Sequence, residues 1–190
     1  MKRTVALVLV LALFAVVSCK RTEQKATQTS TTTSATAPQQ TATTAAGQTD
    51  VGTPMPEYAA LNLDGSKFDL AAKRDKVVLL NVWATWCGPC VYEIPELQQI
   101  HEKYSPRGLE VIGVSVDESG VESVREFVAA QEKMTYPIVL DESGKIANLL
   151  ETTVLPTSIV VDRKGQIVWK KYGAIMEGDE ELKKAIEGAL

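Results

Sequence analysis

The stretch from Val77 to Pro95 constrains the fold more than any other part of the chain. It opens with the apolar, largely β-branched run VVLL at 77–80, which is typical of a strand buried on both faces. It then reaches Cys87 and Cys90, and the apolar residues that follow recur at the spacing of a helix: Ile94, Leu97, Ile100 and Tyr104. The sequence therefore predicts two cysteines at the point where a buried strand gives way to a helix.

This position favours redox chemistry at the two cysteines. A helix start presents unpaired backbone N–H groups and the positive end of the helix dipole, and both favour an ionised thiol at Cys87. Cys90 lies one turn further into the helix, where it is expected to be shielded from solvent and close enough to form a disulfide with Cys87. The pair can therefore attack a disulfide and then resolve the product.

The N-terminal segment has the pattern of an export signal. Lys2 and Arg3 precede an apolar run, 5–17, that is too short for an ordinary membrane-spanning helix. The residues 16–19, VVSC, resemble the lipobox of bacterial lipoproteins, which implies a signal peptide over 1–18 and lipidation of Cys19 as the mature N-terminus. The alternatives are an ordinary signal peptide cleaved nearby and an uncleaved anchor. Each of the three places the rest of the protein outside the cytoplasm.

Two further regions follow the signal. Residues 19–50 are dominated by Thr, Ser, Ala and Gln, so they cannot bury enough apolar surface to offset the entropy of ordering, and we expect a lipid-anchored, disordered tether. Residues 51–190 are expected to form the folded domain.

The cysteine and charge inventory excludes several classes of protein. The chain has 3 cysteines, and with Cys19 assigned to the anchor only the local pair remains, so no structural disulfide framework is possible. His101 is the only histidine, which leaves too few ligands for a zinc site, and Val91 rules out the CxxCH haem attachment motif. A net charge of −4 argues against a nucleic-acid partner. We expect neither a metal nor another cofactor.

The order of predicted elements is that of an α/β domain with a mixed sheet. The segments 58–63 and 67–70 flank Asp64-Gly65, a strong hairpin signal, and 109–116 completes a parallel β-α-β unit with the central strand. Ser119 and Glu122 resemble a capping box that opens a helix ending near Lys133. A strand at 137–140, a short helix at 145–151, a hairpin formed by 157–162 and 166–170, and a final helix from Glu180 complete the domain.

The pentapeptide WCGPC at 86–90, with a second proline, Pro156, before the strand at Thr157, resembles the thioredoxin superfamily. More narrowly, the domain is similar to exported thiol-disulfide oxidoreductases of the TlpA/ResA type. The features shared with that group are the anchored N-terminus, the preceding hairpin, Glu93, and an additional helix and strand between 120 and 140. The resemblance implies a thioredoxin-like fold: a central mixed β-sheet flanked by helices, with an N-terminal β-hairpin and a central αβ insertion.

The resemblance also implies roles for individual residues. Cys87 matches the attacking cysteine and Cys90 the resolving one, so that together they form a redox-active disulfide. Pro156 matches the cis-proline that faces the dithiol, and Leu155 before it is expected to hold the substrate chain through its backbone. The other substrate contacts are expected from the motif itself: Trp86, Gly88 and Pro89.

One position departs from cytoplasmic thioredoxins. They carry a buried aspartate six residues before the first cysteine as the proton acceptor for the resolving thiol, and this chain has Asn81 there. Glu93, three residues after Cys90 and on the same helix face, is the candidate to replace it, which requires burial to raise its pKa. Residue statistics alone predict a solvated Glu93, because glutamate is rarely buried; the resemblance implies the catalytic role.

These observations predict a membrane-tethered, extracytoplasmic protein disulfide reductase facing the periplasm or the exterior. The resemblance implies protein thiol and disulfide substrates, with apocytochrome c as a candidate, and a transmembrane thiol carrier as electron donor. A thiol peroxidase is one alternative, but it needs a TxxC setting and a nearby arginine that do not flank Cys87. A copper-carrying chaperone of thioredoxin-like fold is another, but it uses CxxxC, one residue longer than the spacing from Cys87 to Cys90.

Overall fold

The structure of the chain is a computed structural model, which describes residues 49–131 and 133–190. The predicted signal peptide, the lipidation site Cys19 and nearly all of the predicted tether lie outside these residues. Within the described part, no helix has both the length and the apolar character needed to cross a membrane.

A mixed sheet of seven strands forms the centre of the domain, in the order β2-β1-β5-β4-β3-β6-β7. Its strands are β1 (Ala59–Asn62), β2 (Lys67–Asp69), β3 (Val77–Trp83), β4 (Leu109–Ser115), β5 (Ile138–Leu140), β6 (Thr157–Val161) and β7 (Ile167–Tyr172). Strand β3 pairs in parallel with β4 and antiparallel with β6, and all of its residues are buried. The buried strand predicted from 77–80 is thus the centre of the sheet, and the predicted parallel β-α-β unit is confirmed.

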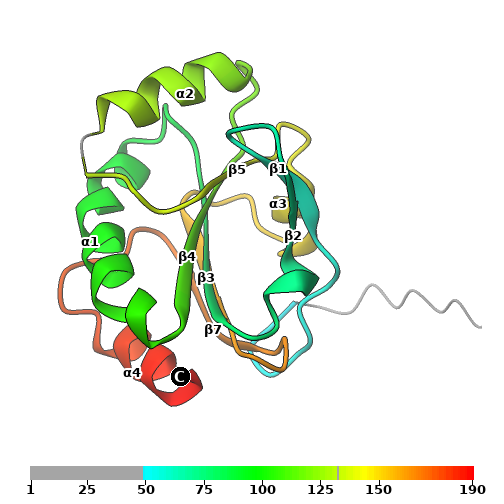
Figure 1. Cartoon of the computed structure of the whole chain (residues 1–190), viewed down its shortest axis with the longest axis vertical. Helices are drawn as coiled ribbons and strands as arrows, with labels where there is room; N and C mark the ends of the chain where they lie inside the picture. The colour runs from blue at the N-terminus through cyan, green and yellow to red at the C-terminus, as the bar shows by residue number, and fades with distance from the viewer. Residues whose placement is uncertain (1–48, 132) are drawn as a thin grey trace, which may run out of the picture. The chain divides into compact units, whose positions relative to one another are not determined.

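Four α-helices cover the two faces of this sheet. They are α1 (Gly88–Tyr104), α2 (Val121–Ala130), α3 (Lys145–Leu149) and α4 (Glu180–Ala189). The side chains of β3 alternate between the faces: Val77 and Leu79 join the core that contains α1, α2 and α4, whereas Val78 and Leu80 join the core beneath α3. Figure 1 shows α1, α2 and α4 on one side of the strands and α3 on the other.

The two additions expected on the thioredoxin-like core are both present. Strands β1 and β2 form an antiparallel hairpin, whose turn is closed by Asp64 accepting a hydrogen bond from the backbone N–H of Ser66. The insertion supplies α2 and β5, and β5 pairs with β4 on one side and with β1 on the other. The hairpin is therefore attached to the central sheet through the inserted strand.

Two expectations about helix α2 are wrong. The predicted capping box does not form: Gly120 is the N-cap of α2 with φ 90°, no side chain caps the helix, and the Ser119 hydroxyl instead meets that of Ser123 at 2.7 Å. The same helix ends at Ala130, before the predicted Lys133.

Candidate active site

The two cysteines lie where β3 gives way to α1. Cys87 is the N-cap of α1, and its Sγ accepts a hydrogen bond from the backbone N–H of Cys90 at 3.3 Å. The two residues are joined by a disulfide, with their Cα atoms 5.2 Å apart, and both are nearly buried. The helix continues through Pro95, which has no N–H to donate within it. A thiolate at Cys87 would thus have a backbone donor and the positive helix end in place.

Glu93 is buried one turn after Cys90, with 1% of its surface exposed. Its Oε1 accepts a hydrogen bond from Asn81 Nδ2 at 2.7 Å, and its Oε2 accepts one from the backbone N–H of Ile175 at 2.6 Å. Asn81 also donates to the hydroxyl of Ser158 at 3.0 Å, so one amide group on β3 links the helix carboxylate to β6. The expectation of a solvated Glu93 from residue statistics is wrong, because three elements close around it.

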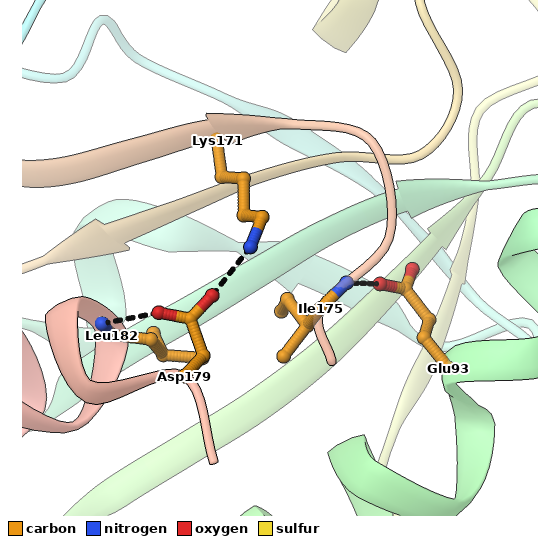
Figure 2. Close-up of polar contacts among 5 residues, drawn as sticks. All are labelled: Glu93, Lys171, Ile175, Asp179 and Leu182. Atoms are coloured by element: carbon orange, nitrogen blue, oxygen red, sulfur yellow. Dashed lines mark hydrogen bonds and ion pairs between the residues drawn. The ribbon is translucent and has the colours of Figure 1, made fainter. Parts of the chain in front are cut away.

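Figure 2 shows how the loop after β7 covers Glu93. Ile175 points its N–H at the carboxylate, and its own side chain is buried. The far end of the loop is fixed by Asp179, which accepts the N–H of Leu182 at 3.0 Å as the N-cap of α4 and pairs with Lys171 of β7 at 2.5 Å. The loop is thus held at both ends, and the donor to Glu93 lies between them.

Burial raises the pKa of Glu93 to about 7. The hydrogen bonds from Ile175 and Asn81 and the positive charge of Lys171 favour the ionised carboxylate, but they offset only part of the desolvation. Burial, and then the charge of Glu93, also raises the pKa of Tyr136 above its ordinary range, so that the phenol stays protonated. Glu93 is therefore the group in this region that can take up or release a proton near neutral pH.

The residues expected to contact substrate differ in exposure: the three from the motif are exposed, Leu155 is half-buried and Pro156 is buried. Trp86 is 69% exposed, and Gly88 and Pro89 are also exposed. Leu155 and Trp86 line one hollow of about 260 Å³. The Leu155-Pro156 peptide bond is cis, and since Thr157 pairs with Val82 in the sheet, the proline lies beside the end of β3 that leads to Cys87.

The sequence analysis missed Lys171 and Ile175, which act on Glu93, and Asp117, which bonds Thr85. Lys171 and Ile175 lie 78 or more positions after Glu93 in the chain, and nothing local to them indicates a contact with it. Asp117 accepts a hydrogen bond from Thr85 and follows a predicted strand that runs parallel to β3. Because the carboxyl ends of parallel strands meet at one edge of a sheet, residues that follow the two strands are expected to lie close together. That signal could have identified Asp117. Within residues 49–131 and 133–190, no group of three or more His, Cys, Asp or Glu side chains is placed to hold a metal.

Comparison with protein families and curated proteins gives a consistent result. The family model described as Redoxin matches residues 50–186. The thiol-disulfide oxidoreductase ResA of Bacillus cereus is 34% identical over 140 residues, which cover 74% of this chain and 76% of the relative. ResA of Geobacillus kaustophilus is 33% identical over 131 residues, which cover 69% of this chain and 74% of the relative.

Solved structures with the same fold agree with these relatives. A Chlorobium tepidum protein assigned as a thiol:disulfide interchange protein DsbE superposes with a TM-score of 0.68 at 30% identity, covering 74% of this chain and 97% of its own. A secreted thiol-disulfide isomerase of Corynebacterium glutamicum superposes with a TM-score of 0.63 at 27% identity, covering 70% of this chain and 83% of its own.

Proposed function

Because this chain belongs to the Redoxin family, as a thioredoxin-like thiol-disulfide oxidoreductase similar to ResA, we propose that it reduces disulfide bonds of proteins outside the cytoplasm. The observation that carries the proposal is the Cys87–Cys90 pair at the N-terminus of α1, with the buried carboxyl of Glu93 one turn below it. The first group supplies a nucleophile and the second a proton acceptor.

The first step is an attack by Cys87. In the reduced protein its thiolate displaces one sulfur of a substrate disulfide, so that a new bond forms between Cys87 and the substrate while the old S–S bond breaks. The leaving substrate thiolate takes a proton from solvent. The N–H of Cys90, 3.3 Å from the Cys87 sulfur, stabilises the negative charge from which the attack begins.

The second step releases the substrate. Cys90 loses its proton and attacks the Cys87 sulfur, which re-forms the Cys87–Cys90 bond and expels the second substrate thiolate. Two electrons have then passed from the protein to the substrate. Glu93 accepts the Cys90 proton, since a carboxyl whose pKa burial raises to about 7 can hold it at neutral pH.

The exposed rim around the disulfide is the proposed substrate site. Trp86, Gly88 and Pro89 supply its exposed part, and the half-buried Leu155 shares a hollow with Trp86, whereas Pro156 is buried behind Leu155. Leu155 would pair its backbone with the substrate chain, and Trp86 would cover the apolar residues beside the substrate cysteine.

The membrane tether and the physiological substrate belong to the same proposal. The basic start, apolar run and VVSC sequence support lipidation at Cys19, which would keep the domain on the outer side of a membrane. Its electrons would then come from a transmembrane thiol carrier. Apocytochrome c, whose haem-binding cysteines must be reduced before haem attachment, is the proposed substrate.

The experiment is to trap substrates with Cys90→Ser in a strain that makes c-type cytochromes. This variant can attack but cannot resolve, so mixed disulfides should accumulate through Cys87, and mass spectrometry should identify apocytochrome c among them. The matched control is Cys87→Ser with Cys90→Ser, which should hold no partner. A trap that stays empty, or that fills equally in the control, would refute the proposal.

The direction of electron flow has its own measurement. Thioredoxin has a reduction potential of about −270 mV, and the strong oxidant DsbA one of about −120 mV. A reductase should have a potential nearer that of thioredoxin. A potential at the oxidising end would mean that the protein forms disulfides instead. Rapid peroxide consumption that Cys87→Ser abolishes would favour the peroxidase alternative.

A further inference from the structure

A second buried carboxylate, that of Asp117, holds the segment that leads into the cysteine motif. Asp117 follows β4 by two residues and is 1% exposed. Its Oδ1 accepts the hydroxyl of Thr85 at 2.5 Å, its Oδ2 accepts the hydroxyl of Ser115 at 2.7 Å, and the backbone N–H of Thr85 lies 3.1 Å from each oxygen. All of these partners are donors, which suits an acceptor-only carboxylate.

Thr85 lies in the middle of a turn that ends at Cys87. The N–H of Cys87 donates to the carbonyl of Ala84 at 3.1 Å, and the N–H of Val116 donates to the carbonyl of Trp83 at 3.0 Å. The turn therefore starts from a fixed point on β3 and β4. In the part of the chain that the structure describes, Asp117 is the only residue whose side chain forms hydrogen bonds with residues 84–86.

We propose that Asp117 is a positioning residue for disulfide exchange at Cys87. By fixing Thr85 it holds the turn 84–87 so that the Cys87 sulfur stays at the N-terminus of α1, within reach of the Cys90 N–H. The position of the sulfur matters most in the reduced protein, because a Cys87 thiolate is charged and accepts a stronger hydrogen bond from the Cys90 N–H than a neutral sulfur does. The proposal rests on the attack by Cys87 and adds to it a residue from the end of β4.

A positioning role and a direct electrostatic role of Asp117 predict opposite changes in the pKa of Cys87 when Asp117 is replaced. If the carboxylate acted through its negative charge, its removal would favour the Cys87 thiolate and lower the pKa of that thiol. If it acts by holding the turn, its removal lets the sulfur move away from its donors and raises the pKa. The direction of the change therefore distinguishes the two.

The experiment compares two pairs of variants in the reduced full chain. Thr85→Val removes only the hydroxyl that Asp117 accepts, whereas Thr85→Ser keeps it. Asp117→Asn removes the charge and one acceptor, and its matched control is Asp141→Asn, a carboxylate 6% exposed that accepts the N–H groups of Lys145 and Ile146 in α3. For each variant, the pH dependence of Cys87 alkylation gives the thiol pKa, and the rate of substrate disulfide reduction is measured at pH 7.

We expect Asp117→Asn and Thr85→Val to raise the pKa of Cys87 and to slow exchange about ten-fold at neutral pH, as a loss of about ten-fold in thiolate implies. Thr85→Ser and Asp141→Asn should stay near the wild type. A pKa that is unchanged or lowered in Asp117→Asn and Thr85→Val would overturn the proposal, and Thr85→Val decides alone if Asp117→Asn does not fold. Exchange that survives Cys87→Ser would instead refute the proposed function.

Discussion

Replacement of Glu93 by glutamine should remove a pH dependence of stability that the buried carboxyl creates. Glutamine has nearly the same shape and stays neutral at every pH. Asn81 and the N–H of Ile175 donate to different oxygens of the carboxylate, so the amide oxygen of glutamine meets only one of these donors and its NH2 group faces the other. The lost bond costs about 1–3 kcal/mol, and this cost is the same at all pH values.

The pH-dependent part follows from the two pKa values of Glu93. Its ordinary pKa is 4.5, and burial raises it to about 7 in the folded domain. Between these values the folded domain keeps a proton that the unfolded chain has released, so its stability falls as pH rises. For one proton the slope is about 1.4 kcal/mol per pH unit, which amounts to about 3 kcal/mol over the interval. Above pH 7 the loss is complete.

The assay is urea unfolding of the oxidised protein at a series of pH values from about 4 to about 8. The free energy of unfolding of Glu93→Gln, minus that of the wild type, should rise through this range by about 3 kcal/mol. Glu102→Gln, on the exposed face of the same helix, is the control for the loss of one carboxylate. A difference between Glu93→Gln and wild type that stays flat or falls would show that the carboxyl is solvated or ionised in the folded state.

Two further predictions concern the loop that covers Glu93 and the packing around Gly113 of β4. Asp179→Ala should destabilise the domain by about 1–2 kcal/mol at pH 7, because it removes the N-cap of α4, whereas Asp179→Asn should keep the cap and lose only the pair with Lys171. Desolvation raises the pKa of Asp179, but the hydrogen bond from Lys171 lowers it, and the net change is downward. The difference in unfolding free energy between Asp179→Asn and wild type should therefore shrink as acid protonates the carboxylate and the pair with Lys171 is lost. Gly113→Ala should cost about 1–3 kcal/mol in urea unfolding, since its Cβ would lie 2.8 Å from Ile138 Cδ1 and 2.9 Å from Trp83 Nε1; an unchanged midpoint would mean that both side chains can move aside.

Local signals predicted the arrangement of the elements well. The Asp64-Gly65 pair marks a turn whose geometry is set within a few residues, and the β1–β2 hairpin forms around it. The capping box failed for a reason that is also local: Gly120, not Ser119, takes the N-cap position, so the serine hydroxyl is one residue too early to cap α2. The position of a helix cap changes with a shift of one residue, whereas the presence of the helix depends on the summed preferences of many residues.

The place of the disulfide could be predicted from local sequence, because a buried strand, a CxxC motif and a helix are all encoded in adjacent residues. Local sequence could not determine the state of Glu93. The raised pKa of that carboxyl depends on the loss of water around it, and the atoms that exclude water come from β3, α1 and the loop after β7. The parallel strands could have indicated Asp117 at the same sheet edge as Thr85, 32 positions away in the chain, but the hydrogen bond between them forms only in the folded domain. Desolvation and long-range hydrogen bonds exist only once distant segments have packed, so the contacts that support the cysteines arise only in the folded domain.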